Sequence, residues 1–200
     1  MRTSPPQPVA GLILAAGAAR RMGQPKQLLD WSGRPLVRVA AETALAGGLE
    51  PVVVVVGHAH DLVAAALEGL PVVIVHNPDY AAGQSSSLRA GLDALAPDTQ
   101  AALVLLGDQP YVTPAIVAAL VDAWQRSGAA AVAPVYGGQR GNPVLFTRAL
   151  FPELRAINGD RGARDLLAAL ADRVQLLPFD DTRPLLDIDT PEDYRAGAGN

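Results

Sequence analysis

The sequence alternates between short β-branched apolar runs and alanine- and leucine-rich stretches, and this alternation constrains the fold more than any other feature. The apolar runs are nearly continuous, as in strands that helices cover on both faces. Strands are expected at residues 9–14, 51–56, 71–75, 101–106 and 129–134, with a later pair near 174–177 and 185–188. Helices are expected at residues 35–46, 59–67, 85–95, 113–126, 147–154 and 161–170.

Strand and helix alternate regularly up to Arg126, which predicts a doubly wound α/β fold of three layers around a mostly parallel sheet. After Tyr136 the alternation breaks in a polar, glycine-rich stretch at residues 137–143. No repeat or linker separates two cores, and 200 residues suit one α/β domain. We therefore expect a single domain over residues 1–200, with residues 1–8 as a flexible tail.

Composition excludes several classes of function. A net charge of −4 gives no electrostatic support for a nucleic-acid partner. The absence of cysteine excludes a disulfide framework, a thiolate nucleophile and a zinc site built on cysteines. The longest apolar runs fall far short of the roughly 20 residues that a membrane-spanning helix needs. We therefore expect a cytoplasmic protein without a membrane partner.

The loop after the first expected strand combines small residues with three cations. Small side chains let backbone N–H groups approach an anion closely. Lys26 is the only lysine beside fifteen arginines, which favours a position where a compact ammonium is needed, although chance retention explains it equally simply. The pattern suits a triphosphate; the alternative is an ordinary connection with surface arginines. The small residues are Ala15, Ala16, Gly17, Ala18 and Ala19, and the cations are Arg20, Arg21 and Lys26.

Carboxylates follow two other apolar runs. Asp108 ends the run at residues 101–106, and Thr113 with the following proline already supplies a helix cap, so Asp108 is available to hold Mg²⁺. Asp189 precedes a second Thr-Pro pair in the same way. If residues 185–189 are extended, Asp187 lies on the same face as Asp189 and is the alternative second ligand. A purely structural role for Asp108 is the competing interpretation.

Three segments resemble one family. L-A-A-G-x-x-x-R-M-G-x-x-K at residues 14–26, G-D-x-P at 107–110 and D-x-D-T-P-E-D at 187–193 are similar to the signature of the nucleotidyltransferases that include the molybdenum cofactor guanylyl- and cytidylyltransferases. N-P-x-x-x-x-G-x-S-S-S-L-R-x-G-L at residues 77–92, with G-D-Q-P, resembles the cytidylyltransferase branch. The resemblance implies a nucleotide-diphospho-sugar transferase-like fold. It also implies transfer of CMP from CTP to molybdopterin, with Mg²⁺ as cofactor and pyrophosphate as product.

The resemblance also assigns residues. It implies catalytic roles for Arg21, Lys26 and Asp108, and a metal site at Asp108 and Asp189. Nucleotide binding falls on Leu14, Ala15, Ala16, Gly17, Arg21, Lys26, Gly83, Ser86, Ser87 and Asp108. Acceptor binding falls on Gln109, Gly141, Asn142, Pro143, Asp160 and Arg164. Asn142 stands where the family commonly has histidine, which leaves the identity of the acceptor open.

Several alternatives remain at this point. One of the serines at residues 85–87 is expected to cap the following helix, with or without a ligand role. His58 and His60 are expected at a helix entry or on the surface rather than in a metal site. The enzyme alternatives are transfer from another triphosphate or to another phosphorylated acceptor, and an NAD(P)H-dependent oxidoreductase, which the missing G-x-G-x-x-G disfavours. A nucleotide-binding chaperone of a molybdoenzyme is the non-catalytic alternative, and a molybdoenzyme or its chaperone is a possible partner.

Overall fold

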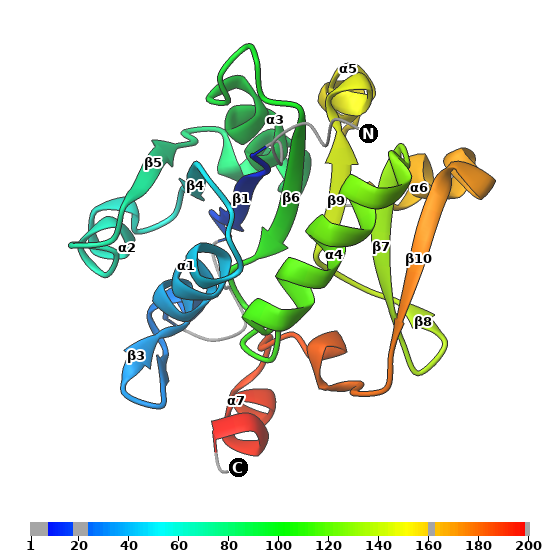
Figure 1. Cartoon of the computed structure of the whole chain (residues 1–200). Helices are drawn as coiled ribbons and strands as arrows, with labels where there is room; N and C mark the ends of the chain where they lie inside the picture. The colour runs from blue at the N-terminus through cyan, green and yellow to red at the C-terminus, as the bar shows by residue number, and fades with distance from the viewer. Residues whose placement is uncertain (1–7, 18–23, 160–162, 199–200) are drawn as a thin grey trace.

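The computed structural model describes residues 8–17, 24–159 and 163–198. Its centre is an eight-stranded sheet in the order β10-β7-β9-β6-β1-β4-β5, with β8 paired to β7 (Figure 1). The pairs β1–β4, β1–β6, β4–β5 and β7–β10 are parallel, whereas β8 and β9 run antiparallel to their neighbours. The strands are β1 (Ala10–Ala15), β4 (Val52–Val56), β5 (Val72–His76), β6 (Ala101–Leu106), β7 (Ala131–Tyr136), β8 (Gln139–Arg140), β9 (Val144–Thr147) and β10 (Val174–Phe179).

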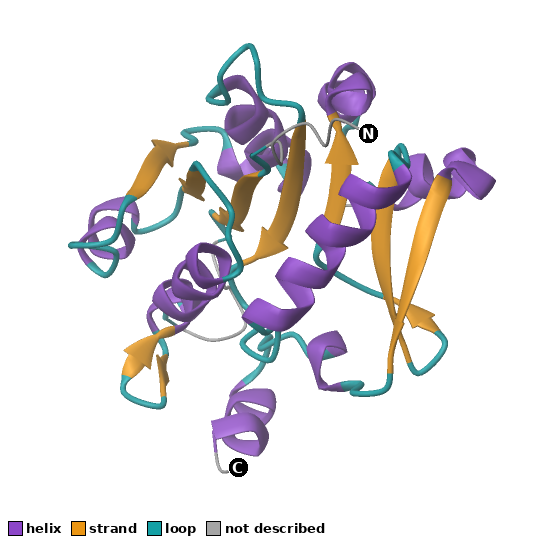
Figure 2. Cartoon of the chain, in the orientation of Figure 1, coloured by secondary structure: helices purple, strands orange, loops and turns teal. Residues whose placement is uncertain are grey.

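Helices cover both faces of this sheet, which gives the three layers seen in Figure 2. The helices are α1 (Leu36–Ala46), α2 (His60–Ala65), α3 (Gln84–Asp93), α4 (Pro114–Ser127), α5 (Phe151–Ala156), α6 (Arg164–Leu170) and α7 (Pro191–Ala198). A small hairpin of β2 (Asp30–Trp31) and β3 (Arg34–Pro35) precedes α1. The predicted doubly wound, mostly parallel α/β fold is therefore confirmed.

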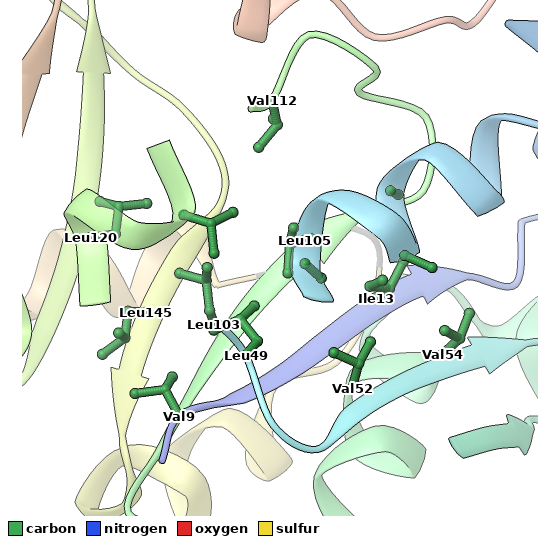
Figure 3. Close-up of a cluster of buried hydrophobic side chains, with 14 of the residues drawn as sticks. Val9, Ile13, Leu49, Val52, Val54, Leu103, Leu105, Val112, Leu120 and Leu145 are labelled. Atoms are coloured by element: carbon green, nitrogen blue, oxygen red, sulfur yellow. The ribbon is translucent and has the colours of Figure 1, made fainter. Parts of the chain in front are cut away.

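Two hydrophobic clusters explain why the strand sequences are almost continuously apolar. Ile13 and Val54 pack with α1 and α4 in one cluster, part of which Figure 3 shows. Leu12 and Val53, their neighbours in sequence, pack with α3, α5 and α6 in the other. Successive side chains of a strand point to opposite faces, so both faces of β1 and β4 require apolar residues.

The expected helix at residues 147–154 was wrong at its start. Residues 144–147 form β9, which lies between β6 and β7, and a short 3-10 helix (Arg148–Leu150) precedes α5. The four residues of β9 are all buried or partly buried, because this strand pairs on both sides. So short an apolar run carries no periodicity that separates a strand from the start of a helix.

The expected strand at residues 185–188 was also wrong. A 3-10 helix (Arg183–Leu185) leads into an irregular segment, and the Ile188 N–H donates to the Asp108 carbonyl at 3.1 Å. Ile188 is buried in a third apolar cluster with Leu29, Trp31, Leu36 and Val39. The segment therefore crosses the end of β6 and packs there instead of joining the sheet.

Candidate active site

Three separate segments bring one cation and two carboxylates together at the carboxyl end of the sheet. Lys26 begins a 3-10 helix (Lys26–Leu28), Asp108 follows β6, and Asp189 precedes α7. The Lys26 Nζ donates to Asp108 Oδ2 in a close contact and to Asp189 Oδ1 at 2.9 Å. The side chains of Lys26 and Asp108 are 17% and 15% exposed, whereas that of Asp189 is 41% exposed. The ion pair is thus largely shielded on the Asp108 side and open on the Asp189 side.

Hydrogen bonds to the backbone hold the two segments that carry Asp108 and Asp189. The bond from the Ile188 N–H to the Asp108 carbonyl ties the Asp189 segment to the end of β6. Asp193 Oδ2 accepts from the Thr190 N–H at 2.8 Å and from the Asp189 N–H at 3.2 Å. The Asp193 N–H donates to Thr190 Oγ1 at 3.2 Å, which completes the capping box that starts α7. Asp189 therefore sits on a helix start whose own cap is supplied by other residues.

Electrostatics distinguishes the groups of this site. Burial lowers the pKa of Lys26, but the facing Asp108 and Asp189 carboxylates outweigh that effect, so the pKa lies above its ordinary value. Burial and the nearby Asp108 charge raise the pKa of Asp187, against the opposing effect of its hydrogen bond from Gln109. That bond runs from Gln109 Nε2 to Asp187 Oδ1 at 2.7 Å. Asp187 thus holds Gln109, while Asp189 makes the contact with Lys26.

The donor set of this site fits a hard divalent cation. Asp108 and Asp189 already converge on one positive group, the Lys26 ammonium, and Asp108 Oδ1 is buried without a hydrogen-bond partner in the described part of the chain. Mg²⁺ is commonly held by one or two carboxylates together with substrate phosphates. Within residues 8–17, 24–159 and 163–198 no group of three or more His, Cys, Asp or Glu side chains forms a metal site. A cation at Asp108 and Asp189 would therefore complete its coordination with oxygen atoms of water or of a substrate.

The loop after β1 has its carbonyls satisfied by protein donors. Gln27, only 2% exposed, donates from Nε2 to the Ala15 carbonyl at 3.1 Å and to the Gly17 carbonyl at 2.7 Å. The His58 N–H donates to the Ala16 carbonyl, and the Gly107 N–H donates to the carbonyl of Leu14 in β1. The loop therefore presents none of these four oxygens unpaired to an anionic ligand. Arg21, the other predicted triphosphate contact, lies outside the described residues.

The predicted serine segment is organised by Asn77. Asn77 Nδ2 donates to Ser86 Oγ at 2.8 Å and to Ser87 Oγ at 3.0 Å, and all three residues are buried. Ser86 Oγ also lies 2.8 Å from the carbonyl of Gly83, the residue that caps α3. No side chain caps this helix, so the expected serine cap was wrong: the hydroxyls are engaged with Asn77 and backbone carbonyls instead. A ligand role for Gly83, Ser86 and Ser87 stays a prediction.

A cavity of about 840 Å³ opens beside Asp108 and Asp189. Four predicted acceptor residues line it, whereas Pro143 is buried and absent from its lining, and Asp160 lies outside the described residues. Apolar side chains from β1, β6, α3, β9 and α6 form part of the wall, and polar groups from β8 and the α6 start form another part. The lining residues are Leu14, Gln84, Leu88, Val104, Leu106, Asp108, Gln109, Gln139, Arg140, Gly141, Asn142, Val144, Phe146, Ala163, Arg164, Leu167, Leu185, Asp187 and Asp189.

The histidines lie at the ends of β4 and β5. The His60 and His76 rings stack with centroids 4.2 Å apart, and the His58 ring lies 6.0 Å from that of Tyr80. Among the described residues, no histidine belongs to a group of three or more His, Cys, Asp or Glu side chains that could hold a metal ion. The contribution of this region to the site is the His58 N–H that holds the Ala16 carbonyl.

Comparison with known proteins assigns the family. The MobA-like NTP transferase domain matches residues 11–174. The chain belongs to the MobA-like NTP transferase family. Its fold is that of the nucleotide-diphospho-sugar transferases, and its class of activity is nucleotidyl transfer. In this chain the Lys26–Asp108–Asp189 cluster and the loop after β1 lie at the carboxyl edge of the sheet, where α/β proteins bind their ligands.

Three known proteins are similar to this chain over most of its length. The nicotine blue oxidoreductase of Paenarthrobacter nicotinovorans is 38% identical over 191 residues, covering 92% of this chain and 93% of the relative. The molybdenum cofactor cytidylyltransferase of Escherichia coli strain K12 is 27% identical and covers 92% of each chain. The manganese complex of Rv0371c from Mycobacterium tuberculosis H37Rv is 30% identical, with a TM-score of 0.81 over 97% of this chain and 100% of that one. Among the described residues, no helix has the length and apolar character required to cross a membrane.

Proposed function

We propose that this protein transfers CMP from CTP to a molybdopterin-type acceptor with release of pyrophosphate, using Mg²⁺. The chain would act in the cytoplasm as a single nucleotidyltransferase domain over residues 1–200. The observation that carries the proposal is the convergence of Lys26 with Asp108 and Asp189, two carboxylates that line the cavity. Two oxygen ligands and a cation beside a loop of small residues provide what a metal-bound triphosphate requires.

The residues divide the work between the two substrates. The loop from Leu14 to Gly17 would hold the nucleotide, and Lys26 and Arg21 would neutralise the triphosphate. Asp108 and Asp189 would hold Mg²⁺, whose charge would stabilise the phosphate oxygens during transfer. The acceptor phosphate would attack the α-phosphorus in line, forming the new P–O bond as the bond to pyrophosphate breaks. No protein nucleophile is needed, so catalysis rests on positioning and electrostatic stabilisation.

The acceptor proposal rests on the character of the cavity wall. Leu88, Val104 and Phe146 are side chains suited to the body of a flat ring system, while Gln139 and Arg140 offer polar and positive groups. Of the predicted acceptor residues, Gln109, Gly141, Asn142 and Arg164 line this cavity, whereas acceptor roles for Pro143 and Asp160 stay predictions. The cytidylyltransferase of E. coli and the G-D-Q-P segment support CTP as the donor.

The direct test is pyrophosphate release from CTP, GTP, ATP or UTP, each with molybdopterin and with or without Mg²⁺. We expect release that depends on Mg²⁺ and is fastest with CTP. Asp108→Asn should lower turnover about 10²-fold or more, because the transition-state charge loses its support. Asp122→Asn, which changes an exposed carboxylate on α4, is the matched control. A near-normal rate for Asp108→Asn would remove the metal assignment, and a preference for GTP would remove the choice of CTP.

One relative favours a second candidate. The nicotine blue oxidoreductase matches 92% of this chain at 38% identity, above the 27% of the cytidylyltransferase. An NAD(P)H-dependent oxidoreductase on the same scaffold is therefore the competing proposal. It predicts that NADH or NADPH binds with quenching of its fluorescence and that none of the four triphosphates yields pyrophosphate. Mg²⁺-dependent pyrophosphate release without nicotinamide binding would eliminate it.

A further inference from the structure

Lys26 occupies the place between the two carboxylates that the proposed function gives to the metal. Its Nζ contacts Asp108 Oδ2 and lies 2.9 Å from Asp189 Oδ1. The two partners are 82 and 163 residues away in the sequence, so this contact depends on the convergence of three distant segments. The ammonium is thus the counter-ion of both carboxylates.

An ammonium and a divalent cation cannot share this place at low cost. Two positive groups within about 4 Å repel each other strongly at the effective dielectric of a protein surface. A metal ion that enters between Asp108 and Asp189 must therefore displace Lys26 or bind weakly. Lysine can move, because its ammonium is carried on four flexible methylene groups. A displaced ammonium needs a new anionic partner, and the polyphosphate of a bound nucleotide supplies one.

We propose that Lys26 is an exchangeable internal counter-ion. It holds Asp108 and Asp189 when the site contains no nucleotide, excludes a divalent cation that arrives alone, and transfers to the polyphosphate when metal and nucleotide enter together. The nucleotide half of this inference rests on the proposed function, whereas the exclusion of free metal rests on the ion pairs alone. Metal and nucleotide binding are consequently coupled through one side chain.

The exclusion of free metal is tested by Mn²⁺ binding without nucleotide, followed by electron paramagnetic resonance. Lys26→Met removes the charge and leaves two carboxylates facing each other, so we expect Mn²⁺ to bind about tenfold tighter or more, within the usual range of coupling between two sites. Lys26→Arg keeps a cation in place and should stay near the wild-type affinity. Arg126→Met removes the same charge from the exposed end of α4 and is the control.

Equal or weaker Mn²⁺ affinity in Lys26→Met would overturn the inference. This outcome is separate from failure of the proposed function, because the measurement uses neither nucleotide nor acceptor. Absence of pyrophosphate release from every triphosphate would remove the proposed function and leave the Mn²⁺ result unaffected.

A measurement on the wild-type protein covers the case in which Lys26→Met does not fold. Because Lys26 is the only lysine, ¹³Cε-lysine labelling gives a single side-chain signal in NMR spectra. We expect Mg²⁺ with tripolyphosphate to shift this signal, and Mg²⁺ alone at the same concentration to leave it in place. A signal that ignores Mg²⁺–tripolyphosphate, or that moves equally with Mg²⁺ alone, would contradict the exchange.

Discussion

Replacement of Gln27 by leucine should weaken both the fold and nucleotide binding. Gln27 is buried, and its amide donates to the Ala15 and Gly17 carbonyls on the loop after β1. Leucine has a similar volume and no donor, so Gln27→Leu removes both bonds without opening a large cavity. The loop that we propose for the triphosphate would lose the side chain that fixes its shape.

The magnitude follows from the contacts. Each of the two hydrogen bonds contributes about 1 kcal/mol net. The substitution leaves the buried Ala15 carbonyl without its Gln27 donor. It also removes Gln27 Oε1, which is buried without a partner within the described part of the chain. A buried oxygen without a hydrogen-bond partner lowers stability by a similar free energy in either place. The removal of Gln27 Oε1 therefore offsets the loss of the donor to the Ala15 carbonyl. The expected loss is therefore about 2 kcal/mol, or roughly 4–8 °C in Tm for a protein of this size.

Urea unfolding and calorimetric titration with Mg²⁺–CTP measure the two effects of Gln27→Leu. We expect a lower unfolding midpoint and a Kd for the nucleotide that rises about tenfold, because the free protein must order the loop on binding. Gln125→Leu, on an exposed position of α4, is the control for the change of side chain. Unchanged stability would refute the hydrogen-bond argument, and lower stability with unchanged nucleotide affinity would refute the role of the loop.

Three further predictions concern stability. The raised pKa of Asp187 means that the folded state disfavours its ionised form, so the free energy of unfolding falls as pH rises through the pKa range of a carboxyl group. Asp187→Asn should therefore raise Tm by a few degrees at pH 7. Thermal melts should show that this gain is lost below about pH 4. Gly91→Ala places a Cβ 2.1 Å from Leu12 Cδ1, so urea unfolding should show a loss of about 1–3 kcal/mol despite the better helix propensity of alanine. Thr190→Ala removes half of the capping box with Asp193 and should cost about 1 kcal/mol by the same measurement.

The central strands of the sheet were predictable because they are buried on both faces. Leu12 and Ile13 belong to different hydrophobic clusters, so neither can be polar, and the resulting apolar run identifies β1 directly. The segment at residues 185–188 is equally apolar but is not a strand. Ile188 is buried by Trp31 and Leu36, which lie far away in the sequence, and no local pattern reports that contact.

The types of residue that converge in the candidate site could be predicted from the sequence, but the contacts between them could not. A lone lysine after a strand and an aspartate at a strand end indicated Lys26 and Asp108. Their mutual contact depends on how three loops meet at the edge of the sheet. Gln27 and Asn77 were missed, since their importance comes from burial of an amide against backbone carbonyls or hydroxyls. The only signal for Gln27 in the sequence was a polar residue directly after Lys26. Polar residues are also common in exposed loops, so this signal did not identify a buried amide.

The regular alternation of strand and helix ends after β7, and the antiparallel strand that follows shapes the cavity wall. In β9, Val144 pairs with Val104 and Thr147 pairs with Ala101, so β9 begins at the edge where β6 ends. An antiparallel strand at this place delivers the residues before it to the side of Asp108. A parallel strand would begin at the opposite edge and carry those residues away. The reversed strand thus places residues 139–142 on the cavity wall, while the parallel strands β1 and β6 supply the proposed nucleotide side. Changes within 139–142 should therefore alter the choice of acceptor more than that of nucleotide.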